Sequence, residues 1–310
     1  MDNNLMIETR ELTKAFGDLV AVDGIDLRVG EGSIHGFVGP NGAGKTTTIK
    51  MLVGAIRSTK GTGFIKGYPI GSVAARKVIG YSPEHPSFYG DMTALDYLIY
   101  MARVSGVERD GARKAAELLD WIELGRFVNT RVGGFSAGMK QRLSLAQALI
   151  HEPELLILDE PTANLDPTGR MTILDKLRQL SQERRVTIFI SSHILSELEQ
   201  LVDSVTLINR GQIAAEDSME HLRKIFSQNH YLLRTSRNES VLEAMKTKAY
   251  LQESWLDADG FIHLISEDST ALKQGVMEAI SQTKVLLEHF SQEEVTLESI
   301  YRRTMGLAKE

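Results

Sequence analysis

A glycine-rich segment, Gly39-Pro-Asn-Gly-Ala-Gly-Lys45-Thr46, matches the pattern G-x-x-x-x-G-K-[ST]. The apolar stretch Ser33 to Val38 precedes it and TTTIKMLVGAI follows, so the segment is predicted to join a buried strand to a helix. In that context the backbone N–H groups of residues 42 to 47 can surround a phosphate, assisted by the positive end of the helix. Lys45 would reach the β- and γ-phosphates of a nucleotide, and the hydroxyl of Thr46 would bind Mg²⁺. The segment therefore predicts a site for nucleotide phosphates.

Two adjacent acidic residues, Asp159 and Glu160, follow the apolar run Leu155 to Leu158. A buried strand would bring both to its carboxyl end, the edge at which open α/β sheets bind ligands. Asp159 can hold Mg²⁺ through water, and Glu160, which points the opposite way, can polarise an attacking water. An isolated Asp-Glu pair is also typical of a solvated strand end. The phosphate loop in the same chain favours the catalytic interpretation.

Three further segments place polar residues near the ends of predicted elements. Ser136 in FSAGMKQ is expected to be the N-cap of a helix. A helix start binds anions, and since the chain already has a phosphate loop, this one would serve a nucleotide held by another subunit. The segment Ala163 to Asp166 closely follows the acidic pair. His193, just after the strand-like VTIFIS, can sense or position a γ-phosphate, although a lone histidine is also compatible with a structural role.

The elements that would position these residues alternate between strands and helices. Strand signals at 155–158, 186–190 and 205–208 are separated by helical stretches, which predicts a parallel sheet covered on both faces. Residues 5 to 30 have the alternating pattern of short strands, and residues 93 to 150 have a helical pattern. NRGQIAAE is predicted to form a closing hairpin.

The length of 310 residues predicts two domains. We expect residues 1–221 to form a nucleotide-binding domain, with a helical subdomain at about 90–150. In residues 222–310 the strand-like HYLLRTS and FIHLIS are mixed with helix-like segments, which predicts a small accessory α+β domain.

Composition excludes several classes of protein. With 35 Lys and Arg against 41 Asp and Glu, the formal net charge is −6, which argues against a generally basic nucleic-acid-binding protein. There is no cysteine, so disulfides, thiolate catalysis and cysteine metal sites are ruled out. No stretch approaches the roughly 18 apolar residues needed to cross a bilayer. A membrane role is therefore expected only through a partner.

The ordered motifs resemble those of the ATP-binding subunits of ABC transporters, over residues 5 to about 215. GPNGAGKTT resembles the Walker A loop, FSAGMKQR the signature, LLILDEP the Walker B motif, ANLD the D-loop and SSH the switch histidine. Tyr81 to Glu84 occupies the position of the Q-loop. The resemblance implies an α/β P-loop NTPase core: a RecA-like parallel sheet, an N-terminal antiparallel β subdomain and a helical subdomain. The small C-terminal α+β domain would be added to this core.

The resemblance also implies roles for individual residues, with ATP and Mg²⁺ as cofactors. Catalysis would depend on Lys45, Glu160 and His193, and Mg²⁺ would be bound by Thr46, Glu84 and Asp159. The nucleotide would be held by an aromatic residue stacked on adenine, by the Walker A loop and by the signature, that is by Phe16, Gly39, Pro40, Asn41, Gly42, Ala43, Gly44, Lys45, Thr46, Thr47, Ser136 and Gly138.

Two departures from the commonest family pattern indicate a subclass. The signature reads FSAGM rather than LSGGQ, so Ala137 and Met139 differ, and Glu84 stands where most members have glutamine. Together with the length of the chain, these features resemble bacterial exporters of the type-two ABC class. That class includes ATPases of bacitracin resistance, lantibiotic immunity and multidrug export.

The expected function is ATP hydrolysis that drives a separate membrane permease for export. Since the chain has one phosphate loop and one signature, two ATP sites require a head-to-tail homodimer with Lys45 from one chain and Ser136 from the other. The protein would be cytoplasmic and peripheral on the inner face of the cell membrane, with no nucleic acid partner. The alternatives are a soluble ABC ATPase acting on ribosomes or DNA, and a non-enzymatic regulator. The single acidic cassette disfavours the first, and Glu160 and His193 disfavour the second.

Overall fold

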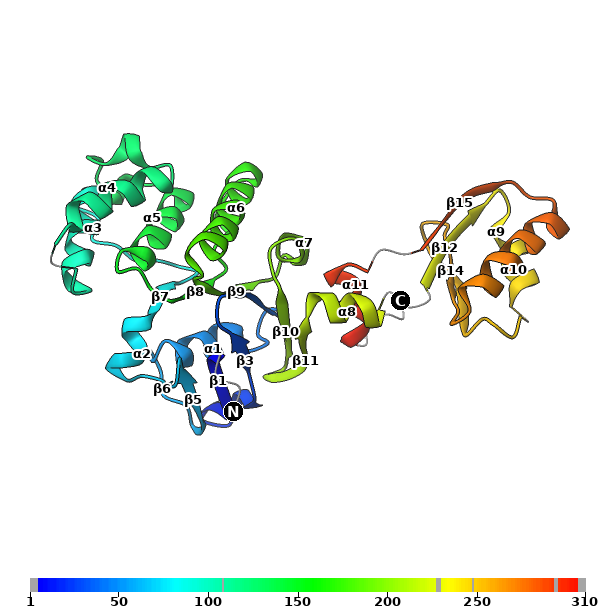
Figure 1. Cartoon of the computed structure of the whole chain (residues 1–310), viewed down its shortest axis with the longest axis horizontal. Coiled ribbons are helices and arrows are strands. Elements are labelled where there is room, and N and C mark those ends of the chain that lie inside the picture. Colours follow the sequence, from blue (N-terminus) through cyan, green and yellow to red (C-terminus); the bar gives the residue numbers. More distant parts are fainter. Residues whose placement is uncertain (1–4, 108, 227–229, 247, 293–294, 306–310) are drawn as a thin grey trace. The chain divides into compact units, whose positions relative to one another are not determined.

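The computed structural model describes residues 5–107, 109–226, 230–246, 248–292 and 295–305 (Figure 1). The chain forms two compact units: the first contains residues 1–219 and 301–310, and the second contains residues 220–300. Residues 1–4 of the predicted nucleotide-binding domain and residues 306–310 of the predicted accessory domain lie outside the described residues. Each unit has a hydrophobic core of its own.

A six-stranded sheet forms the core of the first unit, in the order β11-β10-β4-β9-β8-β7. All neighbouring strands are parallel except β10 and β11, which form the predicted closing hairpin. β4, β8 and β9 are buried along their whole length, as expected for strands covered on both faces. Their carboxyl ends lie at one edge of the sheet and lead into Gly39, Glu160 and His193. The strands are β4 Ile34–Val38, β7 Ile79–Ser82, β8 Leu155–Asp159, β9 Thr187–Ser192, β10 Ser204–Asn209 and β11 Gln212–Ser218.

Five strands near the N-terminus form a second, antiparallel sheet. They pair in the order β2-β1-β5-β6, and β3 also pairs with β1. Ile7 and Ile65 of this sheet share a buried apolar cluster with Phe37 of β4 and Ile49 of α1. The antiparallel sheet therefore packs against the two elements that flank the phosphate loop. Its strands are β1 Leu5–Phe16, β2 Leu19–Ile25, β3 Arg28–Gly30, β5 Lys60–Ile65 and β6 Tyr68–Pro69, and α1 is Lys45–Leu52.

Three helices form a helical subdomain with its own apolar cluster: α3 Ala94–Val104, α4 Gly111–Trp121 and α5 Ala137–Leu149 (Figure 1). Two single 3₁₀ turns, Gly125–Phe127 and Val132–Gly134, connect α4 to α5. The hydroxyl of Thr93 caps α3 by accepting from the N–H of Asp96 at 3.1 Å. The Ser136 hydroxyl caps α5 in the same way, accepting from the N–H of Met139 at 3.2 Å. The N-cap predicted at Ser136 is confirmed.

Three further helices lie wholly within the first unit: α2 Val73–Val78, α6 Pro167–Arg184 and α7 Leu195–Glu199. α6 begins with a proline after the N-cap Asp166, whose Oδ1 accepts from the N–H of Gly169 at 2.6 Å. The sequence analysis assigned no element to residues 73–82, where the structure has α2 and β7. These elements have six and four residues, too few to show a hydrophobic period.

The second unit has a four-stranded antiparallel sheet in the order β13-β14-β12-β15. Its strands and the helices α9 and α10 follow the order of a split βαβ fold. Val241 of α9 and Val276 of α10 share one buried cluster with Leu233 of β12, so both helices cover the same face of the sheet (Figure 1). From Met219 to the end of the described chain, the elements are α8 Met219–Phe226, β12 His230–Thr235, α9 Asn238–Met245, β13 Glu253–Leu256, β14 Ile262–Ile265, α10 Ser269–Thr283, β15 Leu287–Gln292 and α11 Leu297–Thr304.

The predicted architecture is confirmed: a largely parallel sheet, an N-terminal antiparallel sheet, a helical region and a C-terminal α+β unit. The sequence analysis missed β13 and β15 of the C-terminal sheet. Both strands consist of exposed and half-buried residues, so neither shows the apolar alternation that marks a half-buried strand.

Candidate functional site

The phosphate loop lies between β4 and α1, as the sequence predicts. Gly44 has a φ of 107°, and a Cβ there would lie 2.7 Å from the carbonyl oxygen of Ala21. A Cβ at Gly39 would lie 2.3 Å from the carbonyl oxygen of Ile208. Both positions need glycine because the backbone of a neighbouring strand approaches them closely, and Gly44 also needs it for its conformation.

The side chain of Lys45 is buried where α1 begins. Its Nζ donates hydrogen bonds to the carbonyl oxygens of Gly39 at 2.7 Å and Pro40 at 3.3 Å. The same atom lies 3.8 Å from Oε1 of Glu160. The N–H of Ala43, one of the amides expected to face a phosphate, donates to the carbonyl of Pro40 at 3.1 Å. The ammonium group is thus held between loop carbonyls and one carboxylate.

Asp159 ends β8 and is only 1% exposed. Its Oδ1 accepts a hydrogen bond from the hydroxyl of Ser191 at 2.7 Å, whereas its buried Oδ2 has no hydrogen-bond partner among the described residues. Burial, and secondly the negative charge of Asp159, raise the pKa of Tyr81 on β7 to about 12. A buried carboxylate oxygen without a partner is costly, so Oδ2 marks a place where a cation or a donor fits.

Glu160 follows Asp159 with a φ of 49°, a left-handed conformation that residues other than glycine rarely adopt. Strain of this kind is concentrated at functional sites. Oε2 of Glu160 lies 2.8 Å from Nδ1 of His193 and accepts from the backbone N–H of His193 at 3.3 Å. The Glu160 side chain is buried and that of His193 is half exposed. The structure therefore brings together Lys45, Asp159, Glu160 and His193 at one edge of the central sheet.

Phe16 and Glu84, which the resemblance assigns to adenine stacking and to Mg²⁺ binding, both have partly exposed side chains. Phe16 ends β1 with half of its surface exposed, and Nζ of Lys14 lies 4.9 Å from the centre of its ring. Glu84 follows β7, and its Oε1 lies 3.7 Å from Nε2 of His85. Among the described residues, no hydrogen bond or ion pair joins either side chain to Lys45.

The signature residues lie at the start of α5. The exposed Ser136 is its N-cap, and a Cβ at Gly138 would lie 3.2 Å from both the carbonyl oxygen of Asn164 and Cδ2 of Leu165. Gly138 thus allows the D-loop segment after Glu160 to approach α5. No hydrogen bond between Ser136 and Lys45 occurs in the part of the chain that the structure describes.

The sequence analysis did not single out Ser191, which connects the two acidic residues. Its hydroxyl donates to Oδ1 of Asp159 at 2.7 Å and lies 3.1 Å from the backbone nitrogen of Glu160, from which it accepts. Ser191 is the first residue of the SSH segment from which His193 was predicted, so the same motif could have pointed to Ser191. Its contact with Asp159 depends on the pairing of β8 with β9.

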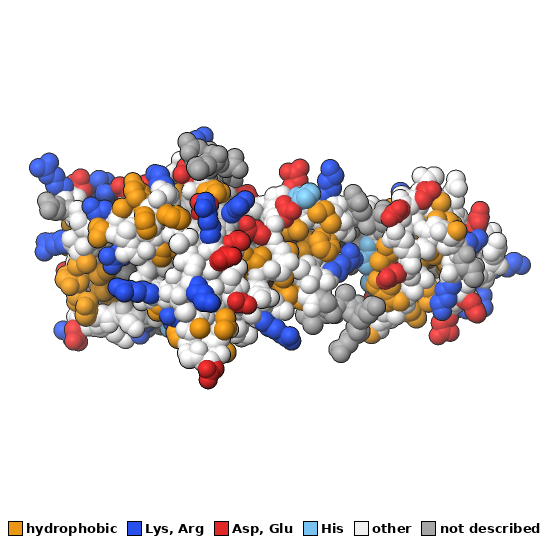
Figure 2. Space-filling view, turned by 90° about the horizontal axis from the view of Figure 1, so that it is seen from below, with side chains coloured by type: hydrophobic (Ala, Val, Ile, Leu, Met, Phe, Trp, Pro, Cys, Tyr) orange, Lys and Arg blue, Asp and Glu red, His pale blue; other side chains and the backbone are white. Residues whose placement is uncertain are grey.

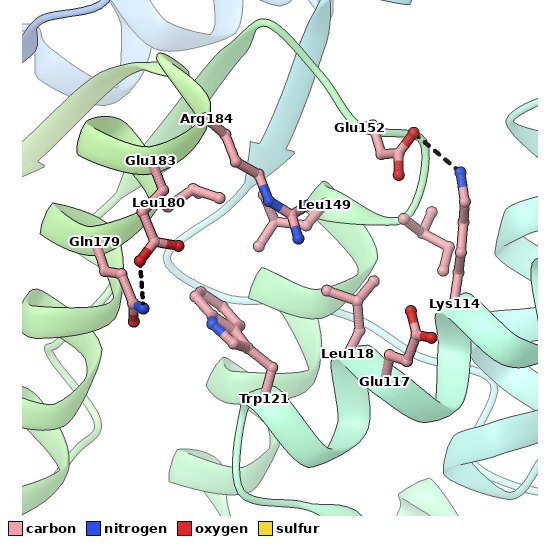
Figure 3. A pocket seen from close by; sticks show the side chains of 11 residues that line it. Lys114, Glu117, Leu118, Trp121, Leu149, Glu152, Gln179, Leu180, Glu183 and Arg184 are labelled. Carbon is pink, nitrogen blue, oxygen red and sulfur yellow. Dashed lines mark hydrogen bonds and ion pairs between the residues drawn. The ribbon is translucent and has the colours of Figure 1, made fainter.

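A cavity of about 300 Å³ lies between α4, the end of α5 and the end of α6 (Figure 3). Trp121, Leu118 and Arg184 point into it, and an ion pair between Lys114 and Glu152 at 3.0 Å lies at one side (Figure 3). None of the residues predicted to bind nucleotide lines this cavity. It is therefore separate from the predicted nucleotide site.

The clustered groups have the chemistry needed to hydrolyse a phosphoanhydride. An ammonium group and the start of α1 can neutralise phosphate charge, and a buried carboxylate with a free oxygen can face a metal ion. A second carboxylate beside a histidine can orient a water molecule and accept its proton. The ABC transporter family model matches residues 22–163, which contain all of these groups except His193.

The chain belongs to the ATP-binding subunits of ABC transporters, and it is an ATPase coupled to transport. It is 38% identical to the bacitracin transport ATP-binding protein BcrA of Bacillus licheniformis, over 97% of this chain and 99% of the relative. It also resembles a solved ATP-binding subunit of an ABC transporter, with a TM-score of 0.66 and 29% identity over 71% of this chain and 93% of that one. A dimeric ATP-binding cassette in a post-hydrolysis state, bound to ADP and phosphate, has the same fold. That match has a TM-score of 0.64 and 23% identity over 69% of this chain and 99% of that one.

Proposed function

We propose that this subunit hydrolyses ATP in a head-to-tail homodimer and powers export through a separate membrane permease. The observation that carries the proposal is the contact of Glu160 with both Lys45 and His193, at 3.8 and 2.8 Å. These are the groups that would bind the γ-phosphate and activate water, and they come from three separate segments of the chain. Such a convergence supports a catalytic role more strongly than any one of the motifs.

Each clustered residue has a distinct role in the proposal. Lys45 and the N–H groups of residues 42–47 bind the β- and γ-phosphates. Glu160 orients the attacking water and accepts its proton, and His193 contacts the γ-phosphate and positions Glu160. Phe16 stacks on adenine, for which its exposed ring is available.

Mg²⁺ fits the site, since Asp159 presents a buried oxygen without a partner. In proteins this ion usually takes one or two carboxylates and completes its shell with substrate phosphates and water. No group of three or more His, Cys, Asp or Glu side chains within the described ranges is arranged to hold a metal. Thr46, Asp159 and Glu84 are the proposed protein contributors. When bound, Mg²⁺ would neutralise charge that develops on the phosphates.

The dimer follows from the position of the signature residues. Ser136 caps an exposed helix start, which can receive a phosphate from another chain. Within the described part of its own chain, no hydrogen bond joins Ser136 to Lys45. A head-to-tail pair would complete two sites at once through one two-fold interface. The solved cassette of the same fold is dimeric, which supports a dimer here.

The permease, the export direction and the location are proposed from the family. Among the described residues no helix is long and apolar enough to cross a membrane. A separate permease would supply the membrane path and hold this subunit on the inner face of the cell membrane. One relative matched along nearly the whole chain is a bacitracin transport ATP-binding protein, which supports a compound similar to bacitracin as cargo. Residues 222–310 are proposed to act as an accessory domain, and the match to that relative, which extends over 97% of this chain, includes most of them.

A soluble ABC ATPase acting on a ribosome or nucleic acid is the second candidate. Figure 2 shows Lys and Arg side chains interspersed with Asp and Glu on the face it presents, rather than a basic surface. The net charge of −6 also disfavours a polyanionic partner. Co-purification of the full chain with a hydrophobic membrane protein would support the permease, and co-purification with ribosomes would support the alternative.

The dimer and its chemistry can be tested with one variant. Glu160→Gln keeps the size of the side chain and one accepting oxygen but removes the base. We expect this variant to form a stable dimer with ATP, measured by light scattering, while phosphate release falls by roughly 10² to 10⁴-fold. A variant that stays monomeric at saturating ATP, or that hydrolyses ATP at the wild-type rate, contradicts the proposal.

A further inference from the structure

The cavity between α4, α5 and α6 lies at the opposite edge of the central sheet from the predicted nucleotide site. Its volume of about 300 Å³ is at the lower end of the range for small-molecule pockets. The lining residues at the end of α5 precede β8, and those at the end of α6 precede β9. The cavity is therefore at the amino ends of two strands whose carboxyl ends lead to Glu160 and His193. A molecule bound there would not occupy the place of ATP.

Apolar side chains from all three helices line the cavity. Trp121 and Leu118 of α4 point into it (Figure 3). Leu149 of α5 and Leu180 of α6 also line it and are buried. The ring of Trp121 is half-buried, and Nζ of Lys176 lies 5.3 Å from its centre. An aliphatic or aromatic molecule fits such a lining, because its binding removes apolar surface of both partners from water.

The charged side chains of the cavity differ in whether they have partners. Each of the three carboxylates that line it is held by a neighbouring side chain. The pairs are Lys114 with Glu152 at 3.0 Å, Arg113 with Glu117 at 2.6 Å and Gln179 with Glu183 at 2.8 Å. Among the described residues, the guanidinium group of Arg184 has no hydrogen bond or ion pair, although it points into the cavity (Figure 3). The cavity therefore offers a cation to a bound molecule, while its carboxylates are already engaged.

The unpaired guanidinium group indicates which anion the cavity would accept. The planar guanidinium fork matches the two oxygens of a carboxylate and binds them with charge-assisted hydrogen bonds. Arg184 of α6 and Trp121 of α4 face the same space from different helices (Figure 3). One molecule can therefore contact the cation with a carboxylate and the indole ring with an apolar body.

We propose that this cavity binds a small carboxylate with an apolar body, such as a medium-chain fatty acid or an arylalkanoate. The carboxylate pairs with Arg184, and the apolar body packs on Trp121 and Leu118. The bound molecule contacts both α4 of the helical subdomain and α6, so it stabilises the first unit against unfolding. The site is independent of the ATP-driven dimer, and its test does not depend on ATP hydrolysis.

The test is a fluorescence titration of the full-length protein with octanoate. The chain has two tryptophans, so Trp255→Phe leaves Trp121 as the only one. Octanoate should change the emission of Trp121 in a saturable way and raise the Tm. Affinity should increase by roughly fourfold per methylene from butanoate to octanoate, the usual effect of burying this group. Octan-1-ol and octylamine have the same chain without the anion, and should bind roughly 10-fold more weakly or worse.

Arg184→Gln removes the guanidinium group and should weaken octanoate binding by roughly 10- to 150-fold, with octan-1-ol binding unchanged. Arg178→Gln is the matched control, since Arg178 lies on the same helix but does not line the cavity. Both variants should hydrolyse ATP at the wild-type rate. A response to octanoate that does not saturate, tighter binding of octylamine than of octanoate, or wild-type octanoate affinity in Arg184→Gln would overturn the inference. The comparison of octanoate with octylamine needs no change at the cavity, so it decides even if Arg184→Gln fails to fold.

Discussion

Nδ1 of His193 lies 2.8 Å from Oε2 of Glu160, a contact that joins the ends of two neighbouring strands, β8 and β9. The other oxygen of the same carboxylate lies 3.8 Å from Nζ of Lys45. A γ-phosphate that draws Lys45 and His193 toward itself would therefore compete with Glu160 for both. Binding of ATP and release of the Glu160 carboxylate for water are then expected to occur together.

Removal of the histidine tests this relationship. His193→Ala should lower ATP hydrolysis by roughly 10²-fold, the lower range for a group that assists proton transfer. ATP binding should change much less, because Lys45 and the phosphate loop remain. Phosphate release and nucleotide titration on the same preparation measure the two effects. His289→Ala is a control, since His289 is exposed in the second unit and contacts Ser291 at 2.7 Å. Equal losses of binding and hydrolysis would contradict the positioning role.

Lys45→Ala should weaken ATP binding and abolish turnover while the fold stays intact. A charge-assisted contact of this kind is worth roughly 1.5–3 kcal/mol, or about a 10- to 150-fold loss of nucleotide affinity. Isothermal titration gives the affinity and circular dichroism checks the fold. Lys50→Ala on the exposed side of the same helix should bind ATP as the wild type does. Wild-type affinity in Lys45→Ala would show that the loop was assigned wrongly.

The sequence predicted the parts of the site whose geometry is local. The phosphate loop, the acidic pair at the end of β8 and the cap at Ser136 each depend on residues adjacent in the chain, so their types and spacing were sufficient. Ser191 and Asp159, by contrast, are separated by 32 residues, and Arg170 and Glu197 by 27. Their contacts depend on strand register and on how two helices pack, which no local pattern encodes. The left-handed φ of Glu160 likewise belongs to the folded chain, because nothing in its residue type requires it.

Ser136→Arg tests whether the exposed start of α5 serves another chain. A bulky cation there should block ATP-driven dimerisation and leave ATP binding to the monomer nearly unchanged. The change also removes an N-cap, which costs roughly 1 kcal/mol of stability. Thr93→Ala removes the equivalent cap of α3 and should dimerise normally, so it controls for that loss. Dimerisation is measured by light scattering with ATP in the Glu160→Gln background. A normal dimer with Ser136→Arg would rule out the composite site.

The buried His35 predicts a pH dependence of stability. Burial lowers its pKa to about 3, and its ring nitrogens lie 2.8 Å from the hydroxyls of Ser204 and Thr206. Between pH 6.5, the pKa of His35 in the unfolded chain, and about pH 3, its pKa in the folded chain, only the unfolded chain binds the proton. The stability that His35 contributes is therefore complete above pH 6.5. It is lost as the pH falls, by roughly 1.4 kcal/mol per pH unit. His35→Gln should be less stable at pH 7, and its difference from the wild type should shrink between pH 6.5 and 5 in urea unfolding. A constant difference would contradict a neutral buried imidazole.

The two glutamates of the site should have different roles, and one pair of variants separates them. Glu160 is buried between Lys45 and His193, whereas the side chain of Glu84 is 40% exposed and follows β7. Glu84 is expected to contribute to Mg²⁺ binding, since a carboxylate is a hard oxygen ligand that this ion accepts. In that role it would also add a negative charge near the γ-phosphate, which the metal would have to offset. Glu84→Gln should therefore keep much of the basal hydrolysis and shift its dependence on Mg²⁺ concentration, because the amide is a weaker ligand.

Glu160→Gln should lose hydrolysis at every Mg²⁺ concentration while still forming the ATP-bound dimer. Parallel measurements of ATP turnover and dimerisation across a Mg²⁺ titration decide between these roles. If Glu84→Gln abolished hydrolysis and Glu160→Gln did not, the general base would be Glu84.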